Sequence, residues 1–161
     1  MTLSEAYQQD PLTISFELFP PKTAKGMDSL FEQLRELVAC GPSYITCTYG
    51  AGSSTRDRTL DVLRRVIAEY PHIPVASHLT CIGATPDSLR AYLEQAAGMG
   101  VRDIVALRGD LPKDQTDSAS ADGEFPYAVN LVRFIRTHFP AFGVAVGGYP
   151  ETHPEAPSRA K

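Results

Sequence analysis

The strongest constraint on the fold is a regular alternation of short β-forming runs with longer stretches of helical apolar spacing. Each β-forming run returns after about 30 residues, which is the length of one strand plus one crossover helix. The expected strands cover residues 12–19, 44–48, 75–80, 103–107 and 142–148. Strands spaced in this way pair in parallel, because a hairpin would return after only a few residues. The sequence therefore predicts an α/β fold.

Helical patterns fill the four intervals between these strands. The first helix is expected to begin with a capping box at Ser29 and Glu32. The second and fourth are predicted by apolar stripes over 60–70 and 128–139. The third opens on Thr85 as N-cap, followed by a proline at the first helical position. Four helices thus alternate with five strands.

The polar residues within the strands decide between an open doubly wound sheet and a barrel. One row of strand side chains is apolar and the other is polar: Ile14, Phe16, Leu18, Ile45 and Cys47 against Ser15, Glu17, Thr46, Thr48, His78 and Thr80. A sheet covered by helices on both faces needs apolar residues in both rows, whereas a barrel opening tolerates polar ones. We therefore expect a TIM-type (βα)8 barrel. Because such barrels have eight strands and typically ~250 residues, residues 1–161 are expected to form a single truncated domain with about the first five strands and four helices.

The composition limits the partners and the compartment. A net charge of −4, without clusters of Lys and Arg, argues against a nucleic-acid or anionic-membrane surface. The first eleven residues lack the pattern of a secretory signal and no long apolar run follows, so a soluble cytoplasmic protein is expected. Cys40, Cys47 and Cys81 are widely spaced and odd in number, which predicts neither a disulfide framework nor a metal site.

Glu17 is the most unusual residue, because it lies in an otherwise apolar strand just before two prolines. Burying a carboxylate costs several kcal/mol unless it is paired or neutral. Either Glu17 forms a salt bridge with Arg or Lys on a neighbouring strand, or desolvation raises its pKa and leaves an acid that can donate a proton near neutral pH.

The other strands also end in groups that can bind or react. The Gly- and Ser-rich loop 48–55 can expose N–H groups to phosphate, although such loops are common. His78 is either a hydrogen-bonded core residue or a ligand contact. The run Arg108, Gly109, Asp110 is either a local turn or a site in which the glycine admits a flat ring, the cation holds phosphate and the anion accepts from N–H donors.

Two further segments belong to the same predicted opening. Residues 111–124 are polar and are expected to form a mobile loop beside it that could act as a lid. The fifth strand is followed by Gly147, Gly148, an aromatic residue and titratable groups. Since parallel strands end on one side, these groups are expected to converge on one opening.

These strand ends carry motifs that resemble those of methylenetetrahydrofolate reductases. In chain order they are SFE (15–17) with FPP (19–21), TYGA (48–51) with RDRT (56–59), HLTC (78–81), ALRGDLP (106–112), and YPE (149–151) with HPEA (153–156). Motifs in the correct order across nearly the whole chain are more specific than any one alone. Two departures stand out: Gly147–Gly148 replaces an alanine-rich strand, and strands six to eight, with the family's folate-binding glutamine, are missing.

The resemblance implies an oxidoreductase acting on a CH–NH bond, with FAD held in a barrel rather than a Rossmann fold. In that family the flavin takes a hydride from NADH or NADPH and reduces 5,10-methylenetetrahydrofolate to 5-methyltetrahydrofolate, in one-carbon metabolism and methionine biosynthesis. Glu17 matches the general acid that promotes opening of the five-membered ring. Asp110 matches a catalytic and substrate-binding aspartate that tunes the flavin.

The resemblance also supplies the expected FAD contacts: Thr48, Tyr49, Ala51, His78, Arg108, Gly109, Asp110, Tyr127, Ala128, Tyr149 and His153. Thr48 is also expected near the nicotinamide. The expected partners are methylenetetrahydrofolate and NAD(P)H, with assembly into a homo-oligomer and no nucleic acid, membrane or metal. Two alternatives stay open. One is a non-catalytic half-barrel that self-associates or binds a partner through its exposed sheet edges. The other is an unrelated barrel hydrolase or lyase that uses Glu17 and Asp110 without flavin.

Overall fold

A parallel five-stranded sheet forms the centre of the computed structural model, which describes residues 2–9, 11–49, 53–110 and 124–153. The strands are β1 (Ser15–Leu18), β2 (Tyr44–Cys47), β3 (Val75–Thr80), β4 (Asp103–Leu107) and β5 (Gly143–Val146). Every predicted strand is present, and β1, β2 and β5 are shorter than predicted. Ile14 was expected to face the helices but is 41% exposed, because β1 begins only after it.

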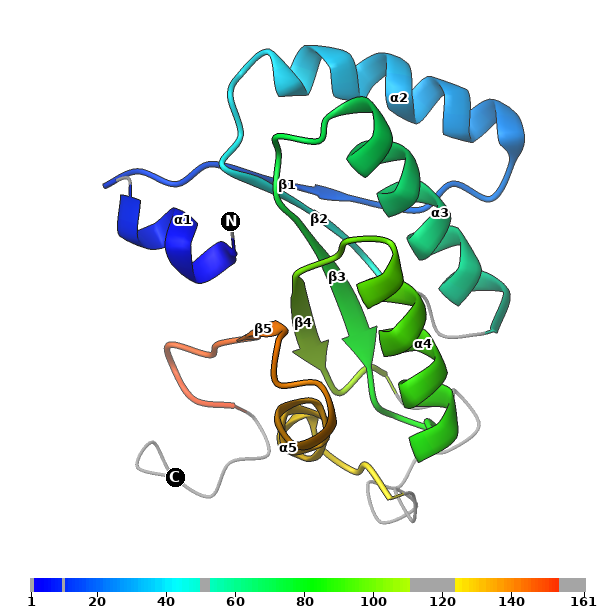
Figure 1. Ribbon diagram of the computed structural model, residues 1–161, viewed down its shortest axis with the longest axis vertical. Helices are drawn as coiled ribbons and strands as arrows, with labels where there is room; N and C mark the ends of the chain where they lie inside the picture. The colour runs from blue at the N-terminus through cyan, green and yellow to red at the C-terminus, as the bar shows by residue number, and fades with distance from the viewer. Residues whose placement is uncertain (1, 10, 50–52, 111–123, 154–161) are drawn as a thin grey trace.

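The strand order identifies the architecture. The strands lie side by side in chain order, β1-β2-β3-β4-β5, with no reversal, whereas a doubly wound sheet reverses at a switch point. The crossover helices are α2 (Ala24–Val38), α3 (Ser53–Glu69), α4 (Pro86–Gly98) and α5 (Ala128–His138). Figure 1 shows α2, α3 and α4 along one side of the sheet. The predicted α/β fold is confirmed, as a partial TIM-type barrel.

The main apolar core lies between the sheet and the crossover helices. Leu34, Leu63, Leu93 and Ile135, one from each crossover helix, belong to one buried cluster together with strand residues Leu18, Ile45 and Cys47. The register pairs Glu17 with Thr46 and Thr46 with Ala76, so these three residues lie on the opposite face. The predicted division into a helix-facing apolar row and a second, polar row is therefore confirmed for β1 and β2.

The helix starts show where local signals worked. At α4, Thr85 Oγ1 accepts from the Ser88 amide at 3.2 Å and Ser88 Oγ accepts from the Thr85 amide at 2.9 Å, so the predicted N-cap is correct. The capping box predicted at Ser29 and Glu32 is wrong. The helix already begins at Ala24, because Thr23 Oγ1 accepts from the Gly26 amide at 3.0 Å.

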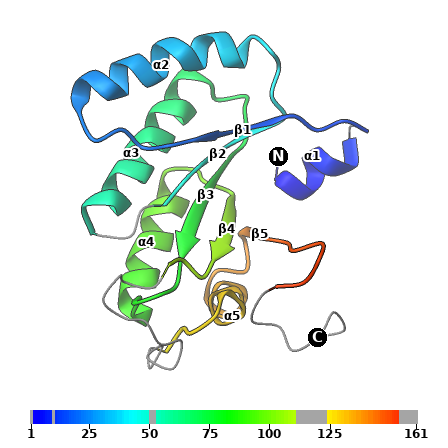
Figure 2. The same cartoon turned by 180° about the vertical axis from the view of Figure 1, so that it is seen from behind.

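A further helix, α1 (Leu3–Gln9), was not predicted. It lies on the other side of the sheet from α2 and α3 (Figure 2). We call this side the helix-free face, because the crossover helices do not cover it. Leu3 and Ala6 pack there against Tyr44 and Ala76, which stand at the start of their strands. We call this end of the sheet, where β1 to β5 begin, the amino end, and the other the carboxyl end. The helix-free face is thus covered at its amino end.

Candidate functional site

The predicted site residues lie at the carboxyl end of the sheet, where loops of (βα)8 barrels build their active sites. Glu17 and His78 lie within β1 and β3; the others follow the strands or open α5: Thr48, Tyr49, Arg108, Gly109, Asp110, Tyr127, Ala128, Tyr149 and His153. Ala51 and the proposed lid up to residue 123 lie outside the described residues. The parallel topology therefore brings the strand ends to one side, as predicted.

Glu17 and His78 share the helix-free face. Glu17 pairs with Thr46, which pairs with Ala76, and His78 stands two residues beyond Ala76 in the same strand. Glu17 is exposed, so the expected burial within the strand is wrong for the described residues. The reason is that β1 pairs with β2 alone and no described element covers its helix-free face. Nor does Glu17 form the alternative salt bridge with any residue that the structure describes.

The negative charge of Glu17 nevertheless raises the pKa of two nearby residues, His78 and Cys47. Burial lowers the pKa of His78 below its ordinary value of 6.5, and the negative charge of Glu17 partly opposes that shift. Burial raises the pKa of Cys47 to about 12, with a further contribution from Glu17. His78 is therefore a neutral imidazole near pH 7, able to donate from one ring nitrogen and accept at the other. Cys47 is an unreactive thiol.

The end of β2 is fixed by hydrogen bonds on two sides. The Thr48 amide donates to the Leu18 carbonyl at 2.9 Å, and the Thr48 carbonyl accepts from the buried Thr59 hydroxyl of α3 at 2.8 Å. The ring of Tyr49 packs edge-on against Tyr92 of α4, with centroids 5.3 Å apart. The two expected ligand contacts that follow β2 are thus held by neighbouring elements.

The end of β4 continues the ladder with the segment that follows β3. The Cys81 amide donates to the Leu107 carbonyl at 3.1 Å and the Ile82 amide donates to the Arg108 carbonyl at 2.9 Å. Gly109 has φ +85°, and a Cβ there would lie 2.9 Å from the Cβ of Thr80. The fold itself therefore requires this glycine. Sequence reasoning had assigned it to the approach of a flat ring, which the structure leaves as a prediction.

The fifth strand end carries an aromatic pair. The rings of Tyr149 and His153 meet at a steep angle with centroids 4.6 Å apart, and the Tyr149 side chain is 60% exposed. Tyr127 is the N-cap of α5 and is also exposed, with its amide donating to Asn130 Oδ1 at 3.3 Å. These side chains present rings to solvent at the end of the sheet where a ligand would approach.

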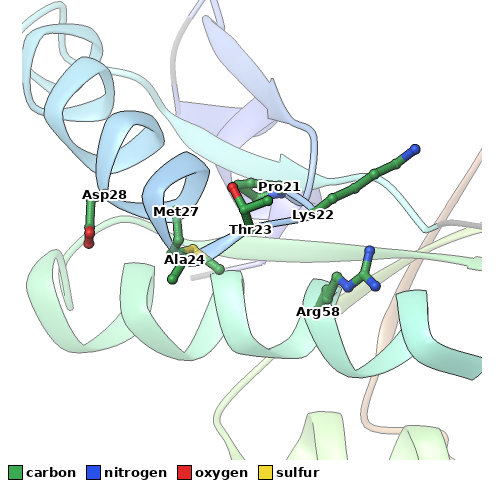
Figure 3. Close-up of a pocket in the computed structure, with 7 residues that line it drawn as sticks. All are labelled: Pro21, Lys22, Thr23, Ala24, Met27, Asp28 and Arg58. Atoms are coloured by element: carbon green, nitrogen blue, oxygen red, sulfur yellow. The ribbon is translucent and has the colours of Figure 1, made fainter.

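Sequence reasoning missed a shallow hollow at the rim of this end, between the starts of α2 and α3. Seven residues line it: Pro21, Lys22, Thr23, Ala24, Met27, Asp28 and Arg58. Figure 3 shows Lys22 and Arg58 extending on the same side, with Asp28 at the far end of the hollow. The FPP and RDRT motifs contain Pro21 and Arg58, which was the available signal, but no role had been attached to either residue.

The described residues contain neither a cluster of metal ligands nor a membrane-spanning helix. The ranges 2–9, 11–49, 53–110 and 124–153 contain no group of three or more His, Cys, Asp or Glu side chains that could hold a metal ion. Among the helices that the structure describes, none is both long and apolar enough to cross a membrane.

Known proteins resemble this chain over nearly all of its length. A sequence model of the family "Methylenetetrahydrofolate reductase" matches residues 2–161. "Methylenetetrahydrofolate reductase (NADH) 1" of Zea mays is 39% identical over 153 residues, 94% of this chain and 26% of the relative. "5,10-methylenetetrahydrofolate reductase" of Escherichia coli (strain K12) is 40% identical over 155 residues, 96% of this chain and 50% of the relative.

The chain thus spans about a quarter to a half of the length of these curated relatives. Among solved structures, a 7,8-dihydropteroate synthase from Vibrio fischeri ES114 aligns with 88% of this chain and 63% of its own, at 12% identity and a TM-score of 0.43. That structural likeness is too weak to carry an argument. The family model matches residues 2–161, nearly the whole chain, and the chain therefore belongs to the methylenetetrahydrofolate reductase family.

Proposed function

We propose that this chain is the FAD- and folate-binding part of an enzyme that reduces 5,10-methylenetetrahydrofolate to 5-methyltetrahydrofolate with NAD(P)H. One observation carries the proposal. In a chain of this family, Glu17 and His78 share the helix-free face, and the Arg108–Asp110 segment follows the adjacent β4 at the same end. The names of the maize and E. coli relatives support the reaction.

The donor set at the carboxyl end fits a flavin nucleotide. Arg108 offers a cation for the pyrophosphate, and Tyr49 and Tyr149 offer rings that can pack against the isoalloxazine. His78 is half-buried and uncharged near pH 7, so it can exchange a hydrogen bond without adding charge beside the ring. When bound, FAD would carry the hydride from the nicotinamide to the folate carbon.

Glu17 would supply the proton that the folate needs. Its carboxyl lies on the helix-free face at β1, where a pterin packed against that face would reach it. The pterin and the flavin would themselves remove water from this exposed carboxyl, which favours its neutral, proton-donating form. The proton goes to the ring nitrogen whose bond to the methylene carbon breaks, and this opens the five-membered ring.

Asp110 would hold the folate from the carboxyl end of β4, on the other side of β2 and β3 from Glu17. It comes two residues after Arg108, whose carbonyl accepts from the Ile82 amide at 2.9 Å, so the backbone leading to the carboxylate is held by the segment after β3. A carboxylate accepts hydrogen bonds from the N–H groups of a pterin and places a negative charge beside the flavin. Its position after β4 separates this binding role from that of Glu17 in β1.

The test is a two-step flavin assay on the purified protein. FAD is added, unbound cofactor is removed, and the visible flavin absorbance is followed without oxygen. NADH or NADPH should bleach the bound flavin, and methylenetetrahydrofolate should restore it. Comparing the two nucleotides identifies the preferred donor. A protein that retains no FAD, or a reduced flavin that folate does not reoxidise, would contradict the proposal.

A second candidate is a half-barrel whose role is association rather than catalysis. It is favoured by the exposure of Glu17 and by the edge positions of β1 and β5, each of which pairs with a single strand among the described residues. Unpaired strand edges are ready positions for another chain. Size-exclusion chromatography with an FAD titration of residues 1–161 separates the two candidates. A monomer that binds FAD tightly would exclude the association role.

A further inference from the structure

Ser77 and Tyr92 form a hydroxyl pair inside the apolar core, and no motif of the chain predicted it. Ser77 Oγ lies 2.6 Å from Tyr92 Oη, and both residues are buried, at 0% and 4% exposure. Ser77 belongs to β3 and Tyr92 to α4, on the helix-covered side of the sheet. An apolar pair would fill this space without the cost of burying two hydroxyl groups. The pair therefore calls for a reason beyond packing.

The pair connects to the carboxyl end of the sheet by two routes. Tyr92 meets the ring of Tyr49 edge-on, with centroids 5.3 Å apart and planes at 88°. Ser77 Oγ also donates to the carbonyl of His78 at 3.1 Å. Because successive strand residues point to opposite faces, Ser77 on the helix side is directly followed by His78 on the helix-free side. The buried hydroxyl pair thus contacts two expected cofactor-binding residues, the ring of Tyr49 and the backbone of His78.

We propose that Tyr92, held by Ser77, is a positioning residue that fixes the ring of Tyr49 at the end of β2. The 2.6 Å hydrogen bond restricts rotation of the Tyr92 ring about its own side-chain bonds. The edge-on contact then favours one orientation of the Tyr49 ring. Ordering Tyr49 before a ligand arrives removes part of the entropic cost of binding. The consequence for FAD rests on the proposed function, whereas the orientation of Tyr49 does not.

The experiment measures the Tyr49 ring and FAD affinity separately, in the whole chain. Tyrosine labelled with 13C in the ring reports the orientation of Tyr49 by NMR, with its signal assigned from the Tyr49→Phe variant among the seven tyrosines. Tyr92→Leu removes the ring contact, whereas Tyr92→Phe and Ser77→Ala remove only the hydroxyl bond. Thermal unfolding followed by circular dichroism shows which variants are folded.

The molecule supplies a matched control at its other end. Tyr7 Oη and Tyr44 Oη lie 2.7 Å apart, and their rings also touch, with centroids 6.0 Å apart. This second hydroxyl pair joins α1 to the start of β2, far along the strands from Tyr49. Tyr7→Phe therefore removes a hydroxyl bond of similar length, from a part-buried pair in which Tyr7 is 61% exposed, without disturbing the proposed support. It should lower stability slightly and leave both the Tyr49 signal and FAD affinity unchanged.

We expect Tyr92→Leu to move the Tyr49 signal toward that of a solvent-exposed tyrosine and to raise the FAD dissociation constant about two- to tenfold, the range of an aromatic edge contact. Tyr92→Phe and Ser77→Ala should shift both readouts in the same direction by less. If Tyr92→Leu folds and its Tyr49 signal is the same as in wild type, the inference is overturned. If Tyr92→Leu does not fold, an unchanged Tyr49 signal in both Tyr92→Phe and Ser77→Ala overturns it. If the wild-type chain binds no FAD, the proposed function fails while the Tyr49 signal still decides the inference.

Discussion

The two ends of the helix-free face use polar groups in opposite ways. At the amino end, α1 covers the face, and Asp103 is only 2% exposed beneath it. At the carboxyl end, Glu17 is exposed and His78 is half-buried, with no described element over them. The same strands thus carry polar groups enclosed by the fold at one end and polar groups open to a ligand at the other. In (βα)8 barrels these ends serve stability and chemistry respectively.

The enclosed end is built around one carboxyl group. The backbone N–H of Leu3, the first residue of α1, lowers the pKa of Asp103 and so partly opposes the larger rise caused by burial. Gly143, its partner in β5, has no side chain, and a Cβ there would lie 1.9 Å from Asp103 Oδ1. Asp103 Oδ2 is buried and has no hydrogen-bond partner within the described residues. The comparison therefore predicts that substitutions at this end change stability, whereas those at the open end change binding and turnover.

The largest effect is expected from Glu17→Gln at the open end. Loss of the proposed general acid should lower folate reduction about 100-fold or more, while bleaching of the flavin by NADH and the unfolding temperature stay near wild type. The two half-reactions are measured separately by stopped-flow absorbance. Glu36→Gln, an exposed carboxylate on α2, should change neither half-reaction. Equal loss in both half-reactions would remove Glu17 from the proton-donor role.

Next in size is Gly143→Ala at the enclosed end. The new methyl group must displace the Asp103 carboxylate, since Asp103 Oδ1 lies 1.9 Å from the Cβ position. Overpacking of this kind should lower the free energy of unfolding by about 2–3 kcal/mol, measured by urea denaturation. Gly147→Ala, just past the other end of the same strand, meets only Leu107 Cδ2 at 3.7 Å. It should stay within about 0.5 kcal/mol of wild type. Similar losses in the two variants would erase the distinction between the ends.

Asp103→Asn should change the pH dependence of stability by a smaller amount. Burial raises the pKa of Asp103 above its ordinary 3.8. The folded state therefore holds this proton more tightly, and the resulting stabilisation is complete below the unfolded pKa and is lost as pH rises through the folded pKa. Asparagine keeps the size of the side chain without the charge, so the variant should gain on wild type as pH rises from 3 to 7. A constant difference in unfolding free energy across that range would count against the buried charge.

The smallest effect is a change in the titration of His78. The negative charge of Glu17 raises the pKa of His78 against the larger lowering caused by burial. Glu17→Gln removes that charge, so the His78 pKa should fall further. The imidazole C–H signals of His78 can be followed by NMR across the titration, in the variant and in the wild-type chain under the same conditions. A His78 pKa that stays the same or rises would show that the two groups are not coupled.

The fold could be predicted further than the site. The spacing of the β-forming runs and their alternation of polar and apolar residues predict the strands, and Thr85 followed by a proline predicts the start of α4. These predictions succeed because each depends on residues that are close together in the sequence. Helix α1 was missed although Thr2 and Glu5 bond to each other's amides as a capping box, since only Leu3 and Ala6 of that helix are buried. One short helix with two apolar positions shows little periodicity.

The site depends on contacts between segments that are distant along the chain. Nothing local distinguishes Glu17 in a covered strand from Glu17 on an open face, so its exposure could not be predicted. Gly109 was assigned to ligand approach because its contacts with Thr80 and Ile82 arise only when β3 and β4 pair. The Ser77–Tyr92 bond likewise joins two elements. Residue types at strand ends indicate what chemistry is available, and the tertiary contacts decide how each group is held.

The unbroken strand order has a consequence for how the molecule is made. Every pairing in the sheet joins strands that are neighbours along the chain, so each β-α unit needs only its predecessor as a surface on which to form. Such connectivity requires no pairing between strands more than one β-α unit apart and suits a chain that leaves the ribosome from its N-terminus, because the units can dock one after another during synthesis. A loop exchanged at one strand end would then disturb its immediate neighbours and leave the remaining units to assemble as before.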